Sequence, residues 1–253
     1  MARAFRGTGR MVTFYTRERG RVEAAAQGIG KPGSTLSAAV EPFTLSTLFL
    51  VEGRGADRLT QCRVIEPFYE LRRDMMRYAY ASAACELVLR TTEAGQVIPG
   101  LFDMLVTYLR EMTVSASPQL LSWAFQLAYL RVSGLGPVLE RCVECGRELS
   151  GGLYSAAQGG LLCGDCARGI EGGLELSPGA VRSLEAIGRF EVQHLGRLRL
   201  SEQIRGQIEA LLRSHIRYHL DLSLKSEAFL RKLQGERTSS ARTEADGGGP
   251  DDQ

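Results

Sequence analysis

The 253-residue sequence has few of the residues that usually carry acid–base or nucleophilic chemistry. It contains only three histidines, His194, His215 and His219, and no glutamate-rich zinc-protease motif surrounds the last two. Neither a Gly-x-x-x-x-Gly-Lys-Ser/Thr phosphate-binding loop nor a Gly-x-Ser-x-Gly nucleophile motif is present. We therefore interpret the chain as a binding protein, not an enzyme, and expect His215 and His219 to be an exposed or core pair.

Hydrophobic runs are short as well. The longest, residues 45–51, has the length of a strand and falls well below the ~20 residues that a membrane span requires. The arginines near the N-terminus are not followed by an apolar segment, so no secretory signal is predicted. Both absences predict a cytoplasmic protein that does not bind membranes.

The net charge of +2 is unevenly distributed along the chain. Residues 1–35 carry seven basic and two acidic side chains, a net charge of +5, whereas residues 236–253 carry two basic and five acidic ones, a net charge of −3. The basic N-terminal region favours a polyanion as partner, with an ordinary solvated strand surface as the alternative. The acidic tail, rich in Thr, Ser, Gly and Asp, is predicted to be disordered.

Segments typical of β-strands fill the first 66 residues. Glycine-containing turns separate predicted strands at residues 11–16, 21–27, 44–52 and 58–65. Several short strands in succession favour a small barrel or sandwich over a parallel sheet. Phe14 and Tyr15 must point to opposite faces of their strand, and we expect Phe14 in the core and Tyr15 at the surface.

After Pro67 the hydrophobic spacing changes to the three- and four-residue steps of α-helices. Helix faces are predicted at Phe68, Leu71, Met75, Tyr78, Ser82, Cys85 and Val88; at Leu101, Leu105, Tyr108 and Met112; and at Leu121, Phe125, Ala128 and Val132. Ser117-Pro118, Ser177-Pro178 and Ser201 are typical helix starts, and Gly134 is a typical helix end. This part of the chain is therefore predicted to be a helical bundle.

Two Cys-x-x-Cys motifs carry the most specific signal in the sequence. Cys142 and Cys145 form the first, Cys163 and Cys166 form the second, and 17 residues separate them. This spacing is typical of a four-cysteine site that holds one Zn²⁺ in a tetrahedral thiolate cage. Two disulfides are the alternative, which a cytoplasmic location disfavours. Because four thiolates leave no open coordination position, we expect the zinc to be structural.

A predicted barrel, a helical domain and a four-cysteine module, in that order, resemble the RecO family of bacterial DNA repair proteins. The motifs that carry this resemblance are residues 9–20, residues 36–43 with Glu41-Pro42-Phe43, Leu59-Thr60-Gln61, Pro67-Phe68 with Leu71-Arg72, Gly134-Leu135-Gly136-Pro137, the cysteine pairs, His219-Leu220, Leu224-Lys225-Ser226 and Phe229-Leu230. The resemblance extends to about residue 233 and rests on the order and spacing of these pieces.

The resemblance implies an α+β multidomain protein. Its expected parts are an OB-fold barrel at residues 1–66, a helical domain at 67–140 and 173–235, a zinc module at 141–172 and a disordered acidic tail at 236–253. Members of the family usually have an extra strand before the segment that corresponds to residues 6–10. This chain begins too late to contain it, so we expect a barrel without its first strand, or a true start upstream. The family's basic loop corresponds here to residues 27–31, where only Lys31 is positive.

The resemblance also implies a recombination mediator that binds single- and double-stranded DNA and anneals complementary strands. Implied partners are RecR, the acidic tail of single-stranded-DNA-binding protein, and RecA, which is loaded onto the exposed strand. These functions would associate the protein with the nucleoid. The candidate DNA-binding residues are Arg10, Arg17, Arg19, Arg21, Lys31, Arg54, Arg58 and Tyr15.

Two other interpretations of the same sequence stay open. A zinc-stabilised scaffold that binds RNA or ribosome components has a similar composition, since OB and zinc modules occur in such proteins as well. A zinc-dependent hydrolase is the third, and the closed set of four cysteines argues against it.

Overall fold

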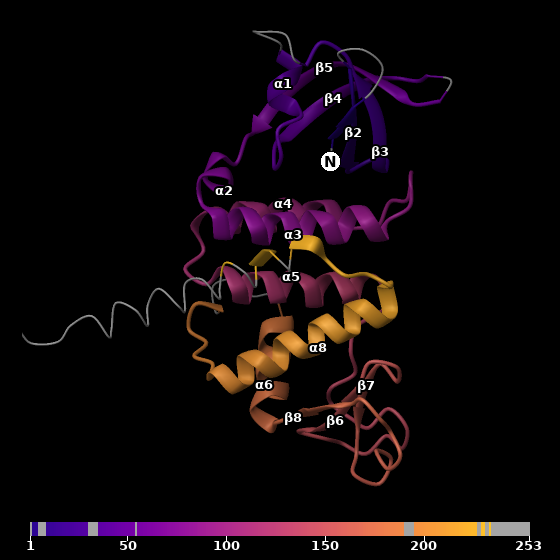
Figure 1. Cartoon of the computed structure of the whole chain (residues 1–253), viewed down its shortest axis with the longest axis vertical. Coiled ribbons are helices and arrows are strands. Elements are labelled where there is room, and N and C mark those ends of the chain that lie inside the picture. The colour runs from indigo at the N-terminus through magenta and orange to yellow at the C-terminus, as the bar shows by residue number, and fades with distance from the viewer. Residues whose placement is uncertain are drawn as a thin grey trace, which may run out of the picture.

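The computed structural model describes residues 2–4, 9–29, 35–53, 55–189, 195–226, 229–230 and 233. The molecule is elongated, with a β-sheet at one end, a layered stack of helices in the middle and a small second sheet at the other end (Figure 1). Lys31, Arg54, His194 and the predicted acidic tail lie outside the described residues. No described helix has the length and apolar character that crossing a membrane would require.

The N-terminal sheet contains five strands in the order β1-β2-β3-β5-β4. Their bounds are Ala2–Ala4 (β1), Arg10–Thr16 (β2), Gly20–Ala26 (β3), Leu45–Val51 (β4) and Asp57–Glu66 (β5), with the short helix α1, Thr35–Ala39, between β3 and β4. All pairs are antiparallel except β3 with β5. Within the described part of the chain β1 and β4 are not paired, so the structure establishes a sheet region and leaves closure of a barrel unproven.

The first strand of this sheet corrects one expectation. β1 pairs with the beginning of β2, with Ala2 opposite Val12 and Ala4 opposite Arg10. The prediction that the first strand is missing is therefore wrong. A strand of three small or charged residues gives almost no hydrophobic pattern, because alternation needs a longer segment to be recognised.

One face of the sheet forms a small hydrophobic core of its own. Val12, Ala24, Ala26, Ile29 and Leu59 are buried in it, and Phe14 packs against it as predicted. The turn between β2 and β3 closes at Gly20, which has a φ of +57°. A Cβ atom at Gly20 would lie 1.8 Å from the backbone oxygen of Gln96, so glycine is required where the sheet meets the helices.

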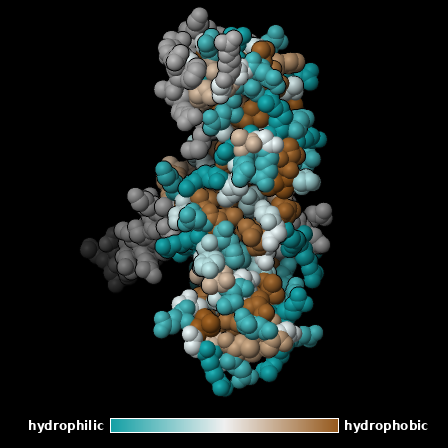
Figure 2. Space-filling model, turned by 90° about the vertical axis from the view of Figure 1, so that its right-hand side faces the viewer, coloured by the Kyte–Doolittle hydropathy of each residue, from teal (hydrophilic) through white to brown (hydrophobic). Residues whose placement is uncertain are grey.

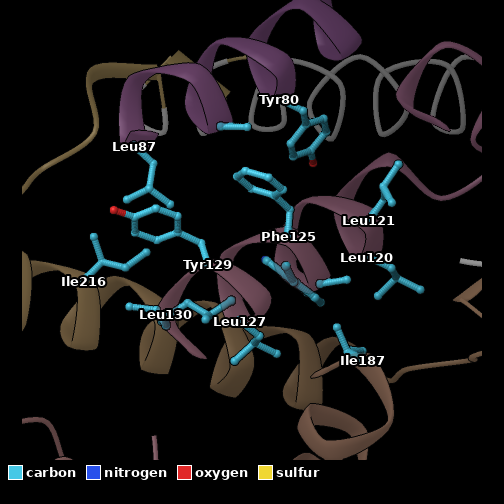
Figure 3. Close-up of a cluster of buried hydrophobic side chains, with 14 of the residues drawn as sticks. Tyr80, Leu87, Leu120, Leu121, Phe125, Leu127, Tyr129, Leu130, Ile187 and Ile216 are labelled. Carbon is cyan, nitrogen blue, oxygen red and sulfur yellow. The ribbon is translucent and has the colours of Figure 1, made fainter. Parts of the chain in front are cut away.

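The helices form consecutive layers below the sheet (Figure 1). They are α2 (Tyr69–Arg73), α3 (Met75–Thr91), α4 (Leu101–Val114), α5 (Pro118–Val132), α6 (Pro178–Gly188) and α8 (Glu202–Leu220). α5 occupies the centre and contacts α3 and α4 on one side and α6 and α8 on the other. In Figure 3, Phe125 and Tyr129 extend toward Tyr80 and Leu87 of α3, and Leu127 extends toward the opposite side.

Most of the local signals for these helices are confirmed. The Ser177 and Ser201 side chains cap α6 and α8 by accepting hydrogen bonds from Ala180 N–H and Ile204 N–H. Gly134 follows α5 with a φ of +72°, as a helix-ending glycine should. The buried residues of α4 include all four that were predicted.

Two predicted helix faces are confirmed only in part. The segment from residue 68 to 88 is not one helix: Asp74 ends α2 and caps α3, and Met75 is 60% exposed. The buried face of α3 is instead rich in alanine, with Ala79, Ala83 and Ala84, which allows close contact with its neighbours. In α5 every residue from 120 to 130 is buried, while the predicted core residue Val132 is 45% exposed, because this helix is covered on all sides.

The C-terminal segment returns to the first long helix. The Glu86 carboxylate of α3 accepts hydrogen bonds from the backbone N–H groups of Lys225 and Ser226 and from the Ser226 hydroxyl. Leu222, Leu224 and Leu230 are buried in the main hydrophobic core. The helical body therefore includes residues from both ends of its sequence.

Candidate metal centre and nucleic-acid interface

The four cysteines of the two motifs come together at the far end of the molecule. A three-stranded sheet supports them, built from β6 (Gly152–Ser155), β7 (Gly160–Leu162) and β8 (Leu174–Leu176). β6 and β7 pair as an antiparallel hairpin, and β8 pairs antiparallel with the other edge of β6. In each motif the chain folds back tightly: Gly146 N–H donates to Cys142 O and Ala167 N–H donates to Cys163 O, both at 2.9 Å.

The sulfur positions fit a tetrahedral metal ion. All four Sγ atoms lie within 4.8 Å of one another, and Cys145 Sγ is 3.7 Å from Cys163 Sγ. A disulfide requires about 2.05 Å between sulfurs, so this pair is not a disulfide. A tetrahedron with Zn–S distances of about 2.3 Å has edges of about 3.8 Å, close to the observed separation. The cluster can therefore hold a metal ion such as zinc.

The electrostatics of the cluster also favour a cation. Backbone N–H groups of Cys145 and Cys163 point at the Cys142 sulfur and lower its pKa to about 6. Hydrogen bonds with the sulfurs of Cys163 and Cys145 raise the pKa of Cys166 to about 12. Without a metal the four sulfurs thus share protons, since four adjacent thiolates would repel each other. A divalent cation replaces those protons and neutralises the site.

The zinc module (residues 141–172) has little apolar material of its own. Its separate core contains only Cys142, Leu162 and Cys163 as buried residues. Its formal charge is −1 from three arginines and four acidic residues, and a Zn²⁺ held by four thiolates would add −2. Such a module repels phosphates, so the metal centre is better placed to stabilise the fold than to contact DNA.

His215 of α8 joins the zinc module to the helical body. Its Nε2 is 2.5 Å from the Leu135 carbonyl oxygen, which can only accept, so Nε2 carries the proton. Its Nδ1 then accepts a hydrogen bond from the Tyr154 hydroxyl of β6. The His219 ring lies 4.3 Å from the His215 ring, centroid to centroid. His215 belongs to the core and His219 is half-buried beside it, so the pair is closer to the core alternative than to the exposed one.

This arrangement predicts a pH dependence of stability. Burial lowers the pKa of His215, the Leu135 hydrogen bond opposes this, and His219 lowers it further. In the unfolded chain the His215 ring has its ordinary pKa near 6.5, and in the folded protein this pKa is lower. The contribution of the neutral ring to the free energy of unfolding is therefore fully present above pH 6.5 and is lost as the pH falls below it. We expect wild type to lose up to about 1.4 kcal/mol more than His215→Gln between pH 7.5 and 5.5 in urea unfolding. Equal losses in the two proteins would contradict this role.

Three of the predicted DNA-binding arginines contact other parts of the protein. Arg17 pairs with Asp103 of α4 at 2.5 Å and lies over the Phe102 ring. Arg19 pairs with Asp57 at 2.7 Å. Arg21 donates to the Leu89 carbonyl oxygen of α3 at 2.9 Å. Two of these contacts, those of Arg17 and Arg21, attach the sheet to the helical body.

The other residues predicted to bind DNA differ in how accessible their side chains are to a ligand. Arg10 and Arg58 are exposed and form no ion pair with any described residue. Tyr15 packs against the core of the helical body and forms a hydrogen bond with the backbone of Ile98, and burial raises its pKa. Its position favours a packing role, so base stacking by Tyr15 stays an untested prediction. Arg63, an exposed arginine on β5, was not among the predicted residues, although the alternation of side chains along this strand could have placed it on the outer face.

Comparison with known proteins identifies the family. A model described as "Recombination protein O N terminal" matches residues 1–68, and one described as "Recombination protein O C terminal" matches residues 72–228. The chain belongs to the RecO family. RecO proteins are DNA repair and recombination proteins, and the family's role as a mediator is not enzymatic.

Several RecO proteins are similar to this chain over most of its length. The DNA repair protein RecO of Pelotomaculum thermopropionicum is 37% identical over 225 residues, which cover 88% of each chain. That of Desulforamulus reducens is 35% identical and covers 92% of this chain and 91% of its own. That of Bacillus pumilus is 30% identical over 90% of this chain and 89% of its own. The resemblance inferred from the sequence motifs is thereby confirmed.

Proposed function

We propose that this RecO protein binds DNA through its N-terminal sheet, anneals complementary single strands and helps load a recombinase onto strands coated by single-stranded-DNA-binding protein. The observation that carries this proposal is the set of exposed arginines on the sheet that lack an ion pair among the described residues, Arg10 and Arg58 among them. Membership of the RecO family supports it. We further propose that the five-stranded sheet is an OB-fold, a fold whose strands and loops bind oligonucleotides.

Annealing requires no covalent chemistry in this proposal. Two strands repel each other through their phosphates, and arginine side chains that contact both backbones reduce this repulsion. Base pairing then supplies the driving force. The exposed pairs Arg17–Asp103 and Arg19–Asp57 are worth at most about 1 kcal/mol each, so a phosphate can compete with the carboxylate for either arginine. Lys31 and Arg54 are proposed as further contacts.

The proposed partners follow from the same function. They are single- and double-stranded DNA, RecR, the acidic C-terminal tail of single-stranded-DNA-binding protein and, indirectly, RecA. We propose that the sheet region binds DNA, that the helical region at residues 67–140 and 173–235 binds the protein partners, and that zinc stabilises the module at residues 141–172.

Strand annealing on coated DNA tests this function. Complementary oligonucleotides, each coated with single-stranded-DNA-binding protein, should anneal faster when the RecO chain is added. Deletion of the acidic C-terminal tail of the single-stranded-DNA-binding protein should remove most of that gain. The binding constant for a single strand should fall with salt, with a log–log slope of about −0.7 for each phosphate neutralised. A charge reversal, Arg58→Glu, should weaken binding and reduce this slope.

Two results would contradict the proposal. One is binding that does not respond to salt, because a phosphate interface cannot be salt-independent. The other is tighter binding of a structured RNA than of single-stranded DNA in competition, which would favour the RNA-binding scaffold. Arg197→Glu changes an arginine of the helical part instead of the sheet and serves as the matched control for Arg58→Glu.

A further inference from the structure

The two halves of the N-terminal sheet are in different situations. The outer side of β2 and the turn into β3 face the helical body, where Tyr15, Arg17 and Arg21 make the contacts described above. Gly20 approaches Gln96 so closely that no side chain fits between them. The part of this half that meets the helices therefore has little free surface for a nucleic acid, whereas Arg10 at the other end of β2 is exposed. β4, at the end of the strand order, has a neighbour only in β5 among the described strands.

The outer face of β4 and β5, which we call the β4–β5 ribbon, presents three exposed cross-strand pairs. These are Thr47 with Arg63, Phe49 with Gln61, and Val51 with Arg58. The alternate residues Leu48 and Leu50 pack against the core of the sheet, so strand alternation forces Phe49 outward. The Phe49 side chain is 52% exposed, unusually high for an aromatic side chain in the middle of a strand.

The charges around this ring have one sign. Arg58 and Arg63 occupy the pairs on either side of Phe49, and neither forms an ion pair with a described residue. The acidic residues of the ribbon itself and of the turn after β4 are at the ends of the two strands. Asp57 is paired with Arg19, Glu66 is held by Arg110 at 2.6 Å, and Glu52 lies beyond the last residue of β4. The middle of the ribbon is thus an aromatic ring between two unpaired cations.

We propose that the β4–β5 ribbon is a stacking site for single-stranded nucleic acid, with Phe49 contacting a base and Arg58 and Arg63 contacting the adjacent phosphates. An aromatic face flanked by cations is the combination that single-strand-binding surfaces use. A protein partner would have to bury both arginines, at a desolvation cost that only acidic groups in matching positions could offset. A single strand supplies a base and phosphates together. The identity of the ligand at this site rests on the proposed function. The new element is the location of the contact, the β4–β5 ribbon.

Fluorescence anisotropy with a labelled oligo(dT) tests the site on the full chain. Phe49→Ala should weaken binding about 5- to 150-fold, the effect of losing one stacked base, without changing the salt slope. Phe49→Trp, which keeps an aromatic ring, should retain wild-type affinity. Arg63→Gln should reduce the slope by about 0.7. Val51→Ala, on the same face, should have little effect, and duplex DNA should bind Phe49→Ala as it binds wild type because paired bases are not free to stack.

The outcomes separate this inference from the proposed function. If wild type binds oligo(dT) and Phe49→Ala binds it equally well, the stacking site is overturned and the DNA-binding function stands. If wild type does not bind oligo(dT), both are overturned. If Phe49→Ala binds oligo(dT) normally but no longer binds purified RecR, the ribbon is a protein interface and the inference is wrong. Because the ring is largely exposed, Phe49→Ala and wild type should unfold at the same temperature, which excludes misfolding as the cause.

Discussion

Cys163→Ser should abolish metal binding at the four-cysteine cluster and unfold the zinc module. The four sulfurs lie within 4.8 Å of one another, and the module's separate core has only three buried residues, so few other contacts maintain this geometry. A structural metal supplies folding free energy directly, and small modules of this kind unfold without it. The helical body should keep most of its structure, because most of its core residues lie in α3, α4, α5, α6 and α8, and the module contributes only Tyr154 and Leu161 to that core.

Native mass spectrometry and limited trypsin digestion measure this effect. Wild type should bind one Zn²⁺ per chain and resist cleavage, and Cys163→Ser should bind none and be cut at the exposed Arg141, Arg147 and Arg168. Cys62→Ser changes a cysteine outside the cluster and should keep both the zinc and the resistance. If Cys163→Ser cannot be purified, a chelator applied to wild type, followed by added zinc, makes the same test. A variant that keeps its zinc and its resistance would show that the cluster is not the metal site.

Phe125→Ala should cause the largest loss of stability among single substitutions in the helical body. Phe125 is completely buried in the middle of α5, and its ring lies 4.6 Å from the Tyr108 ring of α4, centroid to centroid. Removing a buried phenylalanine costs about 3–5 kcal/mol, a large part of the roughly 5–15 kcal/mol by which folded proteins are stable. Figure 3 shows Tyr80 of α3 facing the Phe125 ring, and Tyr108 contacts that ring from α4, so two neighbouring helices pack against it.

The chain carries its own probe for this measurement. Trp123 is the only tryptophan, is 4% exposed and lies in α5 near Phe125, so its fluorescence reports unfolding in urea. Val132→Ala, at the exposed end of the same helix, should change the free energy of unfolding by no more than about 0.5 kcal/mol. A loss below about 1 kcal/mol for Phe125→Ala would mean that α5 is not the centre of the core.

Features with a local cause were predictable from the sequence. The helix starts at Ser177 and Ser201 depend on a side chain three residues from the amide that it caps, and the cysteine motifs depend on spacing within two tight turns. Strands β2 to β5 and the hairpin of β6 and β7 were also predictable, because hydrophobic residues and glycine turns delimit them. These features need no knowledge of the rest of the fold.

Features that depend on distant residues were not predictable. The pair between Arg17 and Asp103 joins residues 86 positions apart, so sequence alone could not show that this arginine contacts the helical body. Tyr15 and the outer side of α5 are covered for the same reason: a neighbouring element packs on what an isolated strand or helix would expose. Figure 2 shows the related difficulty at the surface, where hydrophobic and hydrophilic patches alternate along the molecule and a hydrophobic residue does not by itself indicate the core.

The hydrogen bonds between Glu86 and residues 225 and 226 have a consequence for synthesis. They connect positions up to 140 residues apart, and Leu222, Leu224 and Leu230 complete the core that α3 begins. A ribosome releases the first long helix well before the segment that covers it. The helical body must therefore stay incompletely packed until these late residues have been translated, whereas the five described strands of the N-terminal sheet all precede residue 67.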